Sequence, residues 1–307
     1  MGSLTVVIPT FNREVVLKKA LEAYLLQSNS AEIDELLVVD DGSTDGTEQM
    51  VAEVSRRSAF PIRYLRQSNK GPAAARNYGI REARSPIILF TDSDIVPTNN
   101  FVAQHLEWHN ANPDLNVAVL GYVTWPEEPR PTAFMRWYGE EAIFKYREIE
   151  HDVAISSEFF YTCNVSLKTD FLKNAGLFDE DFKSAAYEDV ELGYRLTKAN
   201  LRLLYNRHAI AYHHQFFLFS DACRKAKANY AAEQVFLSKE AGRVLMAPRL
   251  NRRSKIWFPI ARWIATIAAV CLWPAAWLIN SPMPLPGVVY RLFLWFQVTR
   301  RLDSLSS

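Results

Sequence analysis

The sequence predicts an α/β protein with a mixed, mostly parallel sheet flanked by helices. Over the first 125 residues, short apolar runs rich in β-branched residues alternate with segments whose apolar residues recur at helical spacing. This alternation is typical of a parallel sheet with helices on both faces. The composition, 49% hydrophobic and 22% charged in 307 residues, is that of a folded globular chain with room for one large or two ordinary domains.

The N-terminal alternation predicts individual elements in order. Each strand is a short apolar run bounded by turn residues, and the expected strands are Leu4–Ile8 (ended by Pro9), Leu36–Val39, Ile62–Leu65, Ile87–Phe90 and Val117–Tyr122. The expected helices are Val15–Leu26, a segment capped by Thr44 or Asp45 and reaching about Arg57, Pro72 to about Ala83, and Phe101–Asn110.

Regular alternation stops between residues 125 and 161, where prolines and aromatic residues are concentrated. A new unit is expected from Cys163 to about Lys239. Its expected elements are a helix beginning near Glu188, the strands Arg202–Tyr205 and Ala209–Tyr212, and a long helix after Ser220.

Residues 241–307 differ from the rest in charge and composition. Nine Lys or Arg residues and one acid, Asp303, lie there, so this region carries +8 while the preceding 240 residues carry −7. No charged residue lies between Trp263 and Tyr290, and five of the eight tryptophans follow residue 256. An apolar stretch with edge tryptophans and a basic flank favours peripheral or monotopic association with the cytoplasmic face of the inner (plasma) membrane.

Prolines limit what this region can form. Pro274 and three further prolines between 282 and 286 interrupt it, whereas a straight span needs about 20 apolar residues. An interfacial or re-entrant hairpin within 256–296 is therefore favoured over a transmembrane helix. The alternative is a buried helical pair that packs on the body or on another subunit.

The rest of the chain is expected to be one body, residues 1–240, with halves 1–125 and 126–240. Its cysteines are scattered and form no CxxC pair, which predicts a reduced, cytosolic protein. Met1–Arg13 has no basic start followed by an apolar stretch, so we expect no secretory leader.

Paired carboxylates follow the fourth expected strand in the segment Asp92-Ser93-Asp94. Ligands of open α/β sheets collect at the carboxyl ends of strands, where such carboxylates can bind a divalent cation together with diphosphate oxygens and water. The alternative is ordinary turn chemistry, because Asp is common in turns.

Two further segments are expected at the same edge. Asp40-Asp41-Gly42-Ser43 ends the second strand, where a carboxylate could accept hydrogen bonds from a nucleobase or ribose, or the segment could only begin a helix. Asn69–Asn77 places Gly71 before a helix opened by Pro72. Lys70 and Arg76 there could bind phosphates, or the segment could be a solvated helix start.

In this order, the segments Val6–Arg13, Asp40–Ser43, Gly71–Asn77 and Asp92–Asp94 closely resemble the family 2 glycosyltransferases. The match covers residues 4–100 and continues more loosely to about 240. The resemblance implies a GT-A fold, a Rossmann-like fold of nucleotide-diphospho-sugar transferases. It also implies an inverting transfer that depends on Mn²⁺ or Mg²⁺, with residues 1–125 as the nucleotide-sugar-binding half and 126–240 as the acceptor-side half.

The resemblance also implies roles for individual residues. The donor would be held by the first loop, the acidic loop and the basic segment: Pro9, Thr10, Phe11, Asn12, Asp41, Lys70, Arg76, Asp92 and Ser93. Asp94 would hold the metal, with Asp92 shared between the ion and the donor sugar.

Glu188-Asp189 at a predicted helix start resembles the family's acidic pair. By that resemblance Asp189 is the base that takes the acceptor hydroxyl's proton, and Glu188 helps to hold the acceptor. The alternative is that both acids only stabilise the helix N-terminus.

Two further residues are implied by the resemblance. His213 of the His213-His214 pair is the better match for a metal ligand, although the doubled histidine leaves the choice open. Asn164 is expected to contact a sugar, or else to satisfy strand ends.

The expected partners are a UDP- or GDP-type nucleotide-sugar, a glycan or lipid-linked acceptor, and a membrane surface bound through residues 241–307; no nucleic acid is expected. Two rival functions remain. A nucleotidyltransferase would need a Gly-rich loop after the first strand, which Pro9–Asn12 lacks. A membrane-docked scaffold or sugar-nucleotide-binding protein without catalysis would need neither Asp94 nor Asp189.

Overall fold

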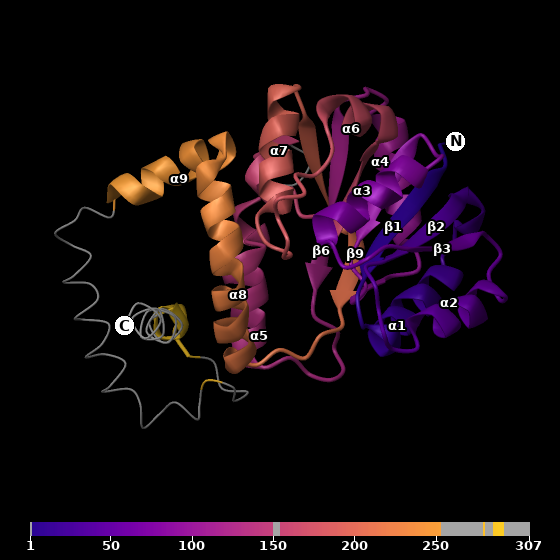
Figure 1. Ribbon diagram of the computed structural model, residues 1–307, viewed down its shortest axis with the longest axis horizontal. Coiled ribbons are helices and arrows are strands. Elements are labelled where there is room, and N and C mark those ends of the chain that lie inside the picture. The colour runs from indigo at the N-terminus through magenta and orange to yellow at the C-terminus, as the bar shows by residue number, and fades with distance from the viewer. Residues whose placement is uncertain (1, 150–153, 253–278, 280–284, 292–307) are drawn as a thin grey trace. The chain divides into compact units, whose positions relative to one another are not determined.

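The computed structural model describes residues 2–149, 154–252, 279 and 285–291 (Figure 1). Two compact units are formed, the first by residues 1–125 and 146–215 and the second by residues 126–145 and 216–307. The predicted boundary at residue 240 falls within the second unit.

The first unit is built on a nine-stranded sheet in the order β3-β2-β1-β4-β8-β6-β9-β5, with β7 paired to β9. The strands are β1 (Leu4–Thr10), β2 (Ile33–Asp40), β3 (Ile62–Arg66), β4 (Ile87–Thr91), β5 (Ile95–Pro97), β6 (Val117–Thr124), β7 (Ala154–Ile155), β8 (Asn164–Lys168) and β9 (Arg202–His213).

One half of the sheet, from β3 to β4, is entirely parallel. In its register Val6 of β1 lies opposite Leu36 of β2 and Leu89 of β4. The apolar residues of β1, β2 and β4 are buried in nearly continuous runs, as expected for strands covered on both faces. The carboxyl ends of these strands therefore meet at one edge.

The other half of the sheet is mixed. β8 runs antiparallel to both of its neighbours, β4 and β6. β9 runs parallel to β6 and pairs antiparallel with β5, which places Ile95 opposite His213. This pairing positions the end of β9 beside the Asp92–Asp94 segment.

The helices of the first unit are α1 (Glu14–Leu25), α2 (Thr47–Ser55), α3 (Pro72–Glu82), α4 (Phe101–Ala111), α6 (Thr169–Ala175) and α7 (Glu188–Lys198). Short 3-10 turns lie at η1 (Ser30–Glu32), η3 (Tyr146–Glu148) and η4 (Ser157–Phe159). α3 packs closely on β1, because a Cβ at Gly79 would lie 2.5 Å from Val7 Cγ1. This glycine permits close helix–sheet approach.

The second unit contains α5 (Ala133–Trp137), the π-helical turn η2 (Tyr138–Ile143), α8 (Phe219–Ser238) and α9 (Glu240–Arg252). Phe134 of α5 is fully buried. Its ring contacts Phe217, Phe219 and Tyr290, with centroids 5.4–6.4 Å apart. An aromatic cluster therefore forms a core of this unit.

The predicted mixed α/β sheet with flanking helices is confirmed, and three details differ. Among the described strands four pairings are parallel and four antiparallel, so the sheet is not mostly parallel. β1 continues through Pro9 to Thr10, and its pairing with β4 stops at Val7. The two strands expected at 202–205 and 209–212 are one strand, β9, with a register shift opposite Gly121–Tyr122. Asn206 stabilises this irregularity, since its Oδ1 accepts a 3.0 Å hydrogen bond from His208 N.

The predicted membrane-associating region, 256–296, lies mostly outside the described residues. Within the part of the chain that the structure describes, no helix combines the length and apolarity needed to cross a membrane.

Candidate active site

Four loops predicted to bind a ligand follow β1, β2, β3 and β4. Asn12 has φ 52°, Gly42 91° and Gly71 95° in or beside these loops, and Tyr187, just before Glu188, has φ 69°. Left-handed conformations of this kind are costly for residues other than glycine, and they cluster at functional sites. Their concentration here marks this edge of the sheet as the candidate site.

The loop after β1 contributes one exposed aromatic ring. Phe11 is 43% exposed, whereas Thr10 is buried. Asn12 is also exposed, and its Oδ1 accepts a 2.8 Å bond from Thr44 N while its own N–H donates to Ser43 Oγ at 2.8 Å. Asn12 thus ties this loop to the loop after β2, and Phe11 presents an exposed ring to a ligand.

The Asp41 carboxylate fixes the loop that leads to α3. It accepts hydrogen bonds from Gln67 Nε2 at 2.7 Å, Lys70 N at 2.8 Å and Gly71 N at 2.8 Å. Gly71 is required there, since a Cβ would lie 2.8 Å from the Lys183 carbonyl oxygen. Asp41 therefore orders the backbone of Lys70, whose side chain is exposed.

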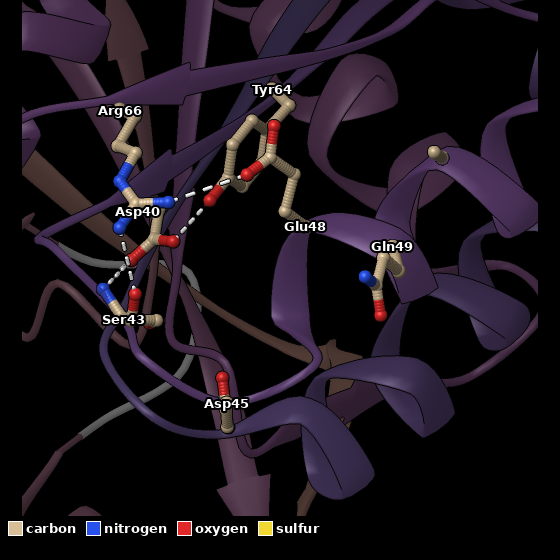
Figure 2. A pocket seen from close by; sticks show the side chains of 8 residues that line it. Asp40, Ser43, Asp45, Glu48, Gln49, Tyr64 and Arg66 are labelled. Carbon is tan, nitrogen blue, oxygen red and sulfur yellow. Dashed lines mark hydrogen bonds and ion pairs between the residues drawn. The ribbon is translucent and has the colours of Figure 1, made fainter.

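The neighbouring Asp40 has a different environment, a cavity of about 360 Å³ (Figure 2). Figure 2 shows Asp40, Ser43, Tyr64 and Arg66 converging there. Asp40 accepts hydrogen bonds from Ser43 N at 2.8 Å and from the Tyr64 hydroxyl, and burial next to Asp40 raises the Tyr64 pKa. Asp40 is committed to this end of β2, and Asp41 does not line the cavity.

Arg76 links the loop that contains Asp92 to Glu188, the neighbour of the predicted base Asp189. Its side chain is 3% exposed, with Nη2 2.8 Å from Asp92 Oδ1 and Nη1 2.9 Å from Glu188 Oε1. The resemblance placed Arg76 against the nucleoside; the structure places its guanidinium between these carboxylates. Asp92 keeps 36% of its side chain exposed, so one face of its carboxylate is open to a ligand.

The pair Glu188-Asp189 begins α7. Burial and the neighbouring Asp189 charge raise the pKa of Glu188 to about 7. Burial also raises the pKa of Asp189, against the opposing effect of Arg76. The half-buried Asp189 carboxylate therefore has a raised affinity for a proton, which suits a general base.

Asp94 faces two cationic or cation-binding side chains. Its Oδ2 lies 2.8 Å from Arg13 Nη1 and 3.4 Å from His213 Nε2. The His213 ring stacks on Trp125, with centroids 5.0 Å apart and planes at 15°. His214 instead donates its backbone N–H to the Asp94 carbonyl at 2.7 Å, so His213 is the histidine whose ring faces Asp94.

These groups fit a divalent cation bound by two protein ligands. Two ligand atoms at right angles on an ion with bonds of about 2.1 Å lie about 3 Å apart, close to the 3.4 Å between Asp94 Oδ2 and His213 Nε2. Within the described residues no group of three or more His, Cys, Asp or Glu side chains forms a metal site. The remaining ligands would come from the diphosphate and water.

The structure contradicts the predicted contact of Asn164 with a sugar. Its side chain is fully buried and its amide donates to the carbonyls of Tyr122 at 3.3 Å and Ala209 at 3.0 Å, while its oxygen lies 2.9 Å from His105 Nε2. Both donors and an acceptor site are used inside the sheet. Asn164 satisfies strand ends, the alternative reading, and has no donor left for a sugar.

Three residues near the carboxylates had no predicted role: Arg13, Trp125 and Cys163. Arg13 is the last residue of the first motif, so its position could have suggested a role. Trp125 directly follows β6, which extends two residues beyond the predicted strand end at Tyr122. Burial and the surrounding charges of Asp92, Asp94 and Asp189 raise the pKa of the Cys163 thiol. Cys163 therefore stays protonated beside the site.

Residues 5–175 match the model described as Glycosyl transferase family 2. Validoxylamine A glucosyltransferase of Streptomyces hygroscopicus subsp. limoneus is 34% identical over 217 residues, covering 63% of this chain and 47% of that protein. Chondroitin synthase of Escherichia coli is 29% identical over 245 residues, covering 70% of this chain and 35% of that protein. The chain thus spans about half or less of these relatives.

Solved structures share the fold. A mannosyltransferase from Pyrobaculum calidifontis, in complex with GDP-Man and Mn²⁺, superposes with a TM-score of 0.65 at 18% identity, covering 99% of this chain and 87% of that one. S. aureus TarS in complex with UDP-GlcNAc gives a TM-score of 0.55 at 20% identity, covering 78% and 67% of the two chains. These likenesses establish a GT-A-like fold.

Proposed function

The chain belongs to glycosyl transferase family 2, and on this premise we propose that it transfers a sugar from a nucleoside-diphosphate sugar to an acceptor hydroxyl, with inversion. The observation that carries the proposal is the convergence of a candidate metal site, a donor-binding carboxylate and a candidate base at one sheet edge. Asp94 faces His213. Arg76 pairs with Asp92 and with Glu188, the neighbour of Asp189.

The donor is a UDP- or GDP-type sugar nucleotide. Two neighbours with this fold were solved with GDP-Man and with UDP-GlcNAc. In this chain Phe11 offers an exposed ring for stacking on a nucleobase. Lys70, with its side chain exposed beside the Asp41-anchored loop, offers a charge to phosphate. Asp92 presents its exposed face to the donor sugar.

The cofactor is a divalent cation held by Asp94 and His213. An imidazole ligand favours Mn²⁺, because Mg²⁺ takes almost only oxygen ligands. When bound, such an ion stabilises the negative charge that develops on the leaving nucleoside diphosphate.

Asp189 is the catalytic base. It takes the proton of the acceptor hydroxyl while that oxygen forms a bond to the anomeric carbon. The bond from that carbon to the diphosphate oxygen breaks, and its electron pair leaves with the nucleoside diphosphate. Glu188 and Arg76 hold α7 against the donor loop, so the base stays opposite the leaving group.

The acceptor is a glycan or lipid-linked sugar presented at the cytoplasmic face of a membrane. The basic, tryptophan-rich sequence at 241–307 supports this part of the proposal. The rival non-catalytic scaffold has no use for a base with a raised pKa, and a nucleotidyltransferase would need a Gly-rich loop after β1.

The test begins with a panel of UDP- and GDP-sugars, scored with Mn²⁺ by thermal shift, followed by release of nucleoside diphosphate from the donor that binds. Asp189→Asn should lower turnover by about 10²–10⁴-fold while leaving donor affinity within about twofold, because Asp189 is assigned to the acceptor. Asp170→Asn, an exposed aspartate on α6, is the matched control and should retain turnover. If wild type turns over no nucleotide-sugar yet binds vesicles, the scaffold replaces the enzyme.

A further inference from the structure

Arg13 occupies the carboxylate oxygen that is best placed for a metal. Its Nη1 lies 2.8 Å from Asp94 Oδ2, the same oxygen that faces His213 Nε2 at 3.4 Å. The Asp94 side chain is only 10% exposed, whereas Arg13 is 40% exposed. A buried carboxylate is thus neutralised by a cation that reaches it from the solvent side.

A guanidinium and a divalent cation compete for this oxygen. A bound metal would place two positive charges next to the guanidinium, and like charges at such a distance repel strongly away from bulk water. The metal therefore binds well only when Arg13 leaves Asp94.

The bound donor supplies the alternative partner. Arg76 is buried and engaged by both Asp92 and Glu188, so it cannot move to a diphosphate without leaving two carboxylates unpaired. Arg13, by contrast, precedes α1 on a loop, and its long side chain is partly in solvent. A guanidinium pairs strongly with phosphate oxygens, and the diphosphate must lie next to a metal held by Asp94.

We propose that Arg13 stands in for the metal in the free protein and moves from Asp94 to the diphosphate when metal and donor bind. Arg13 thereby couples the two ligands: each makes the displacement of Arg13 less costly for the other. This inference rests on the proposed function for the identity of the nucleotide. Its first consequence concerns the metal alone: Mn²⁺ binds weakly to the free protein because Arg13 opposes it.

The experiment measures Mn²⁺ affinity of the full chain by the electron paramagnetic resonance signal of free Mn²⁺, first without nucleotide and then with saturating UDP or GDP. In wild type, nucleotide should strengthen Mn²⁺ binding by roughly 5- to 150-fold, the usual range of coupling between sites. Arg13→Gln should bind Mn²⁺ alone about 3- to 10-fold more tightly and lose most of this enhancement, because neutral Gln neither opposes the metal nor pairs with phosphate.

Two controls separate this role from a structural one. Arg13→Lys keeps the charge and should restore weak binding of Mn²⁺ alone. Arg57→Gln removes an exposed arginine whose partner is Glu22, at 3.1 Å on α1, and should match wild type in every arm.

The measurement of Mn²⁺ affinity without nucleotide tests the competition between Arg13 and the metal, independently of the measurement with nucleotide. Equal or weaker binding of Mn²⁺ by Arg13→Gln overturns the proposal, as does the absence of Mn²⁺ binding in both proteins. If UDP and GDP fail to bind while Arg13→Gln still binds Mn²⁺ more tightly, the proposed function fails and the competition at Asp94 stands.

Discussion

At the scale of single residues, Arg76 explains why so many acids can share one small site. Its guanidinium is 3% exposed and pairs with Asp92 and Glu188, and the nearby Asp189 also favours its charged form. One cation therefore faces three carboxylates, so the cluster keeps an excess of negative charge. Burial and this excess of negative charge, chiefly that of Asp189, together raise the pKa of Glu188 to about 7.

This excess predicts a pH effect for Glu188→Gln. Glu188 and Asp189 titrate as a coupled pair, and replacing one acid by a neutral amide lets the other lose its proton more easily. The acidic limb of kcat/KM should therefore move to lower pH by about one unit. The pH profile of nucleotide release measures it, and Glu191→Gln, which removes a buried acid paired with Arg195 on the same helix, should leave the limb in place. An unshifted limb in Glu188→Gln would show that the pair is not coupled.

The same raised pKa has a consequence for stability. Because the folded-state pKa of about 7 exceeds the ordinary value of 4.5, the folded protein binds more protons than the unfolded chain between these values. Stability from this group is thus present below about pH 4.5 and is lost as pH rises towards 7. Glu188→Gln removes this loss, so its unfolding free energy should rise relative to that of wild type as pH increases from about 4.5 to about 7.

At the scale of elements, a buried polar network joins α4 to β8. Ser166 Oγ lies 2.8 Å from His105 Nδ1 and 2.9 Å from His109 Nε2, and His105 Nε2 lies 2.9 Å from Asn164 Oδ1. Burial lowers the pKa of His105 to about 4 and of His109 to about 3. Both rings are therefore neutral in the folded protein, and the network holds β8 in register behind the active site.

This network predicts acid sensitivity. The unfolded chain takes up protons at these histidines near pH 6.5 whereas the folded protein does not, so stability falls as pH drops from about 6.5 towards 4. Each histidine contributes a slope of up to about 1.4 kcal/mol per pH unit. His109→Gln should remove about one proton from the slope measured by urea unfolding, and exposed His208→Gln should remove none. An unchanged slope in His109→Gln would mean that His109 charges in the folded state.

The limits of sequence-based prediction also appear at this scale. Long apolar runs such as those of β1, β2 and β4 were predicted because burial on both faces leaves a continuous pattern. β5 has only three residues and β8 contains Asn164 and Ser166, so neither has an apolar run of its own. Asn164 was assigned to a sugar from the family resemblance, because its partners in the fold, His105 on α4 and Ala209 on β9, are remote in sequence.

The candidate site likewise has some residues that the sequence could predict and some contacts that it could not. Asp92, Asp94 and Asp189 could be predicted from motifs that lie next to strand or helix ends. The pairing of Arg13 with Asp94 could not, because the two are 81 residues apart and no local pattern links them. Which carboxylate Arg76 neutralises likewise depends on how α3 and α7 pack, a tertiary feature.

At the scale of the whole molecule, charge is divided along the chain. Residues 1–240 carry −7 and residues 241–307 carry +8. An acidic body is repelled by an anionic membrane surface, so attachment of such a protein must depend on its basic segment. The proposed acceptor is membrane-presented, and the basic segment would supply the attraction to the surface that the acidic body lacks.

This division predicts that binding to membranes resides in the C-terminal region. Vesicles with anionic lipid should float the full chain but not a chain that ends at Lys239, just before α9 begins at Glu240. Replacing Arg249, Arg252, Arg253 and Lys255 by Gln should weaken binding strongly, since each basic residue near an anionic surface contributes about 1 kcal/mol.

Lys18→Gln/Lys19→Gln on α1 is the matched control, because both side chains are exposed and lie in the acidic body. Its flotation should equal that of wild type. Added salt separates the two contributions expected of the tail: charge attraction falls as screening increases, whereas tryptophan insertion does not. If the four-Gln variant floats as well as wild type, apolar insertion alone anchors the protein. If the shortened chain also floats, the membrane site lies in the body, and the predicted role of residues 241–307 is wrong.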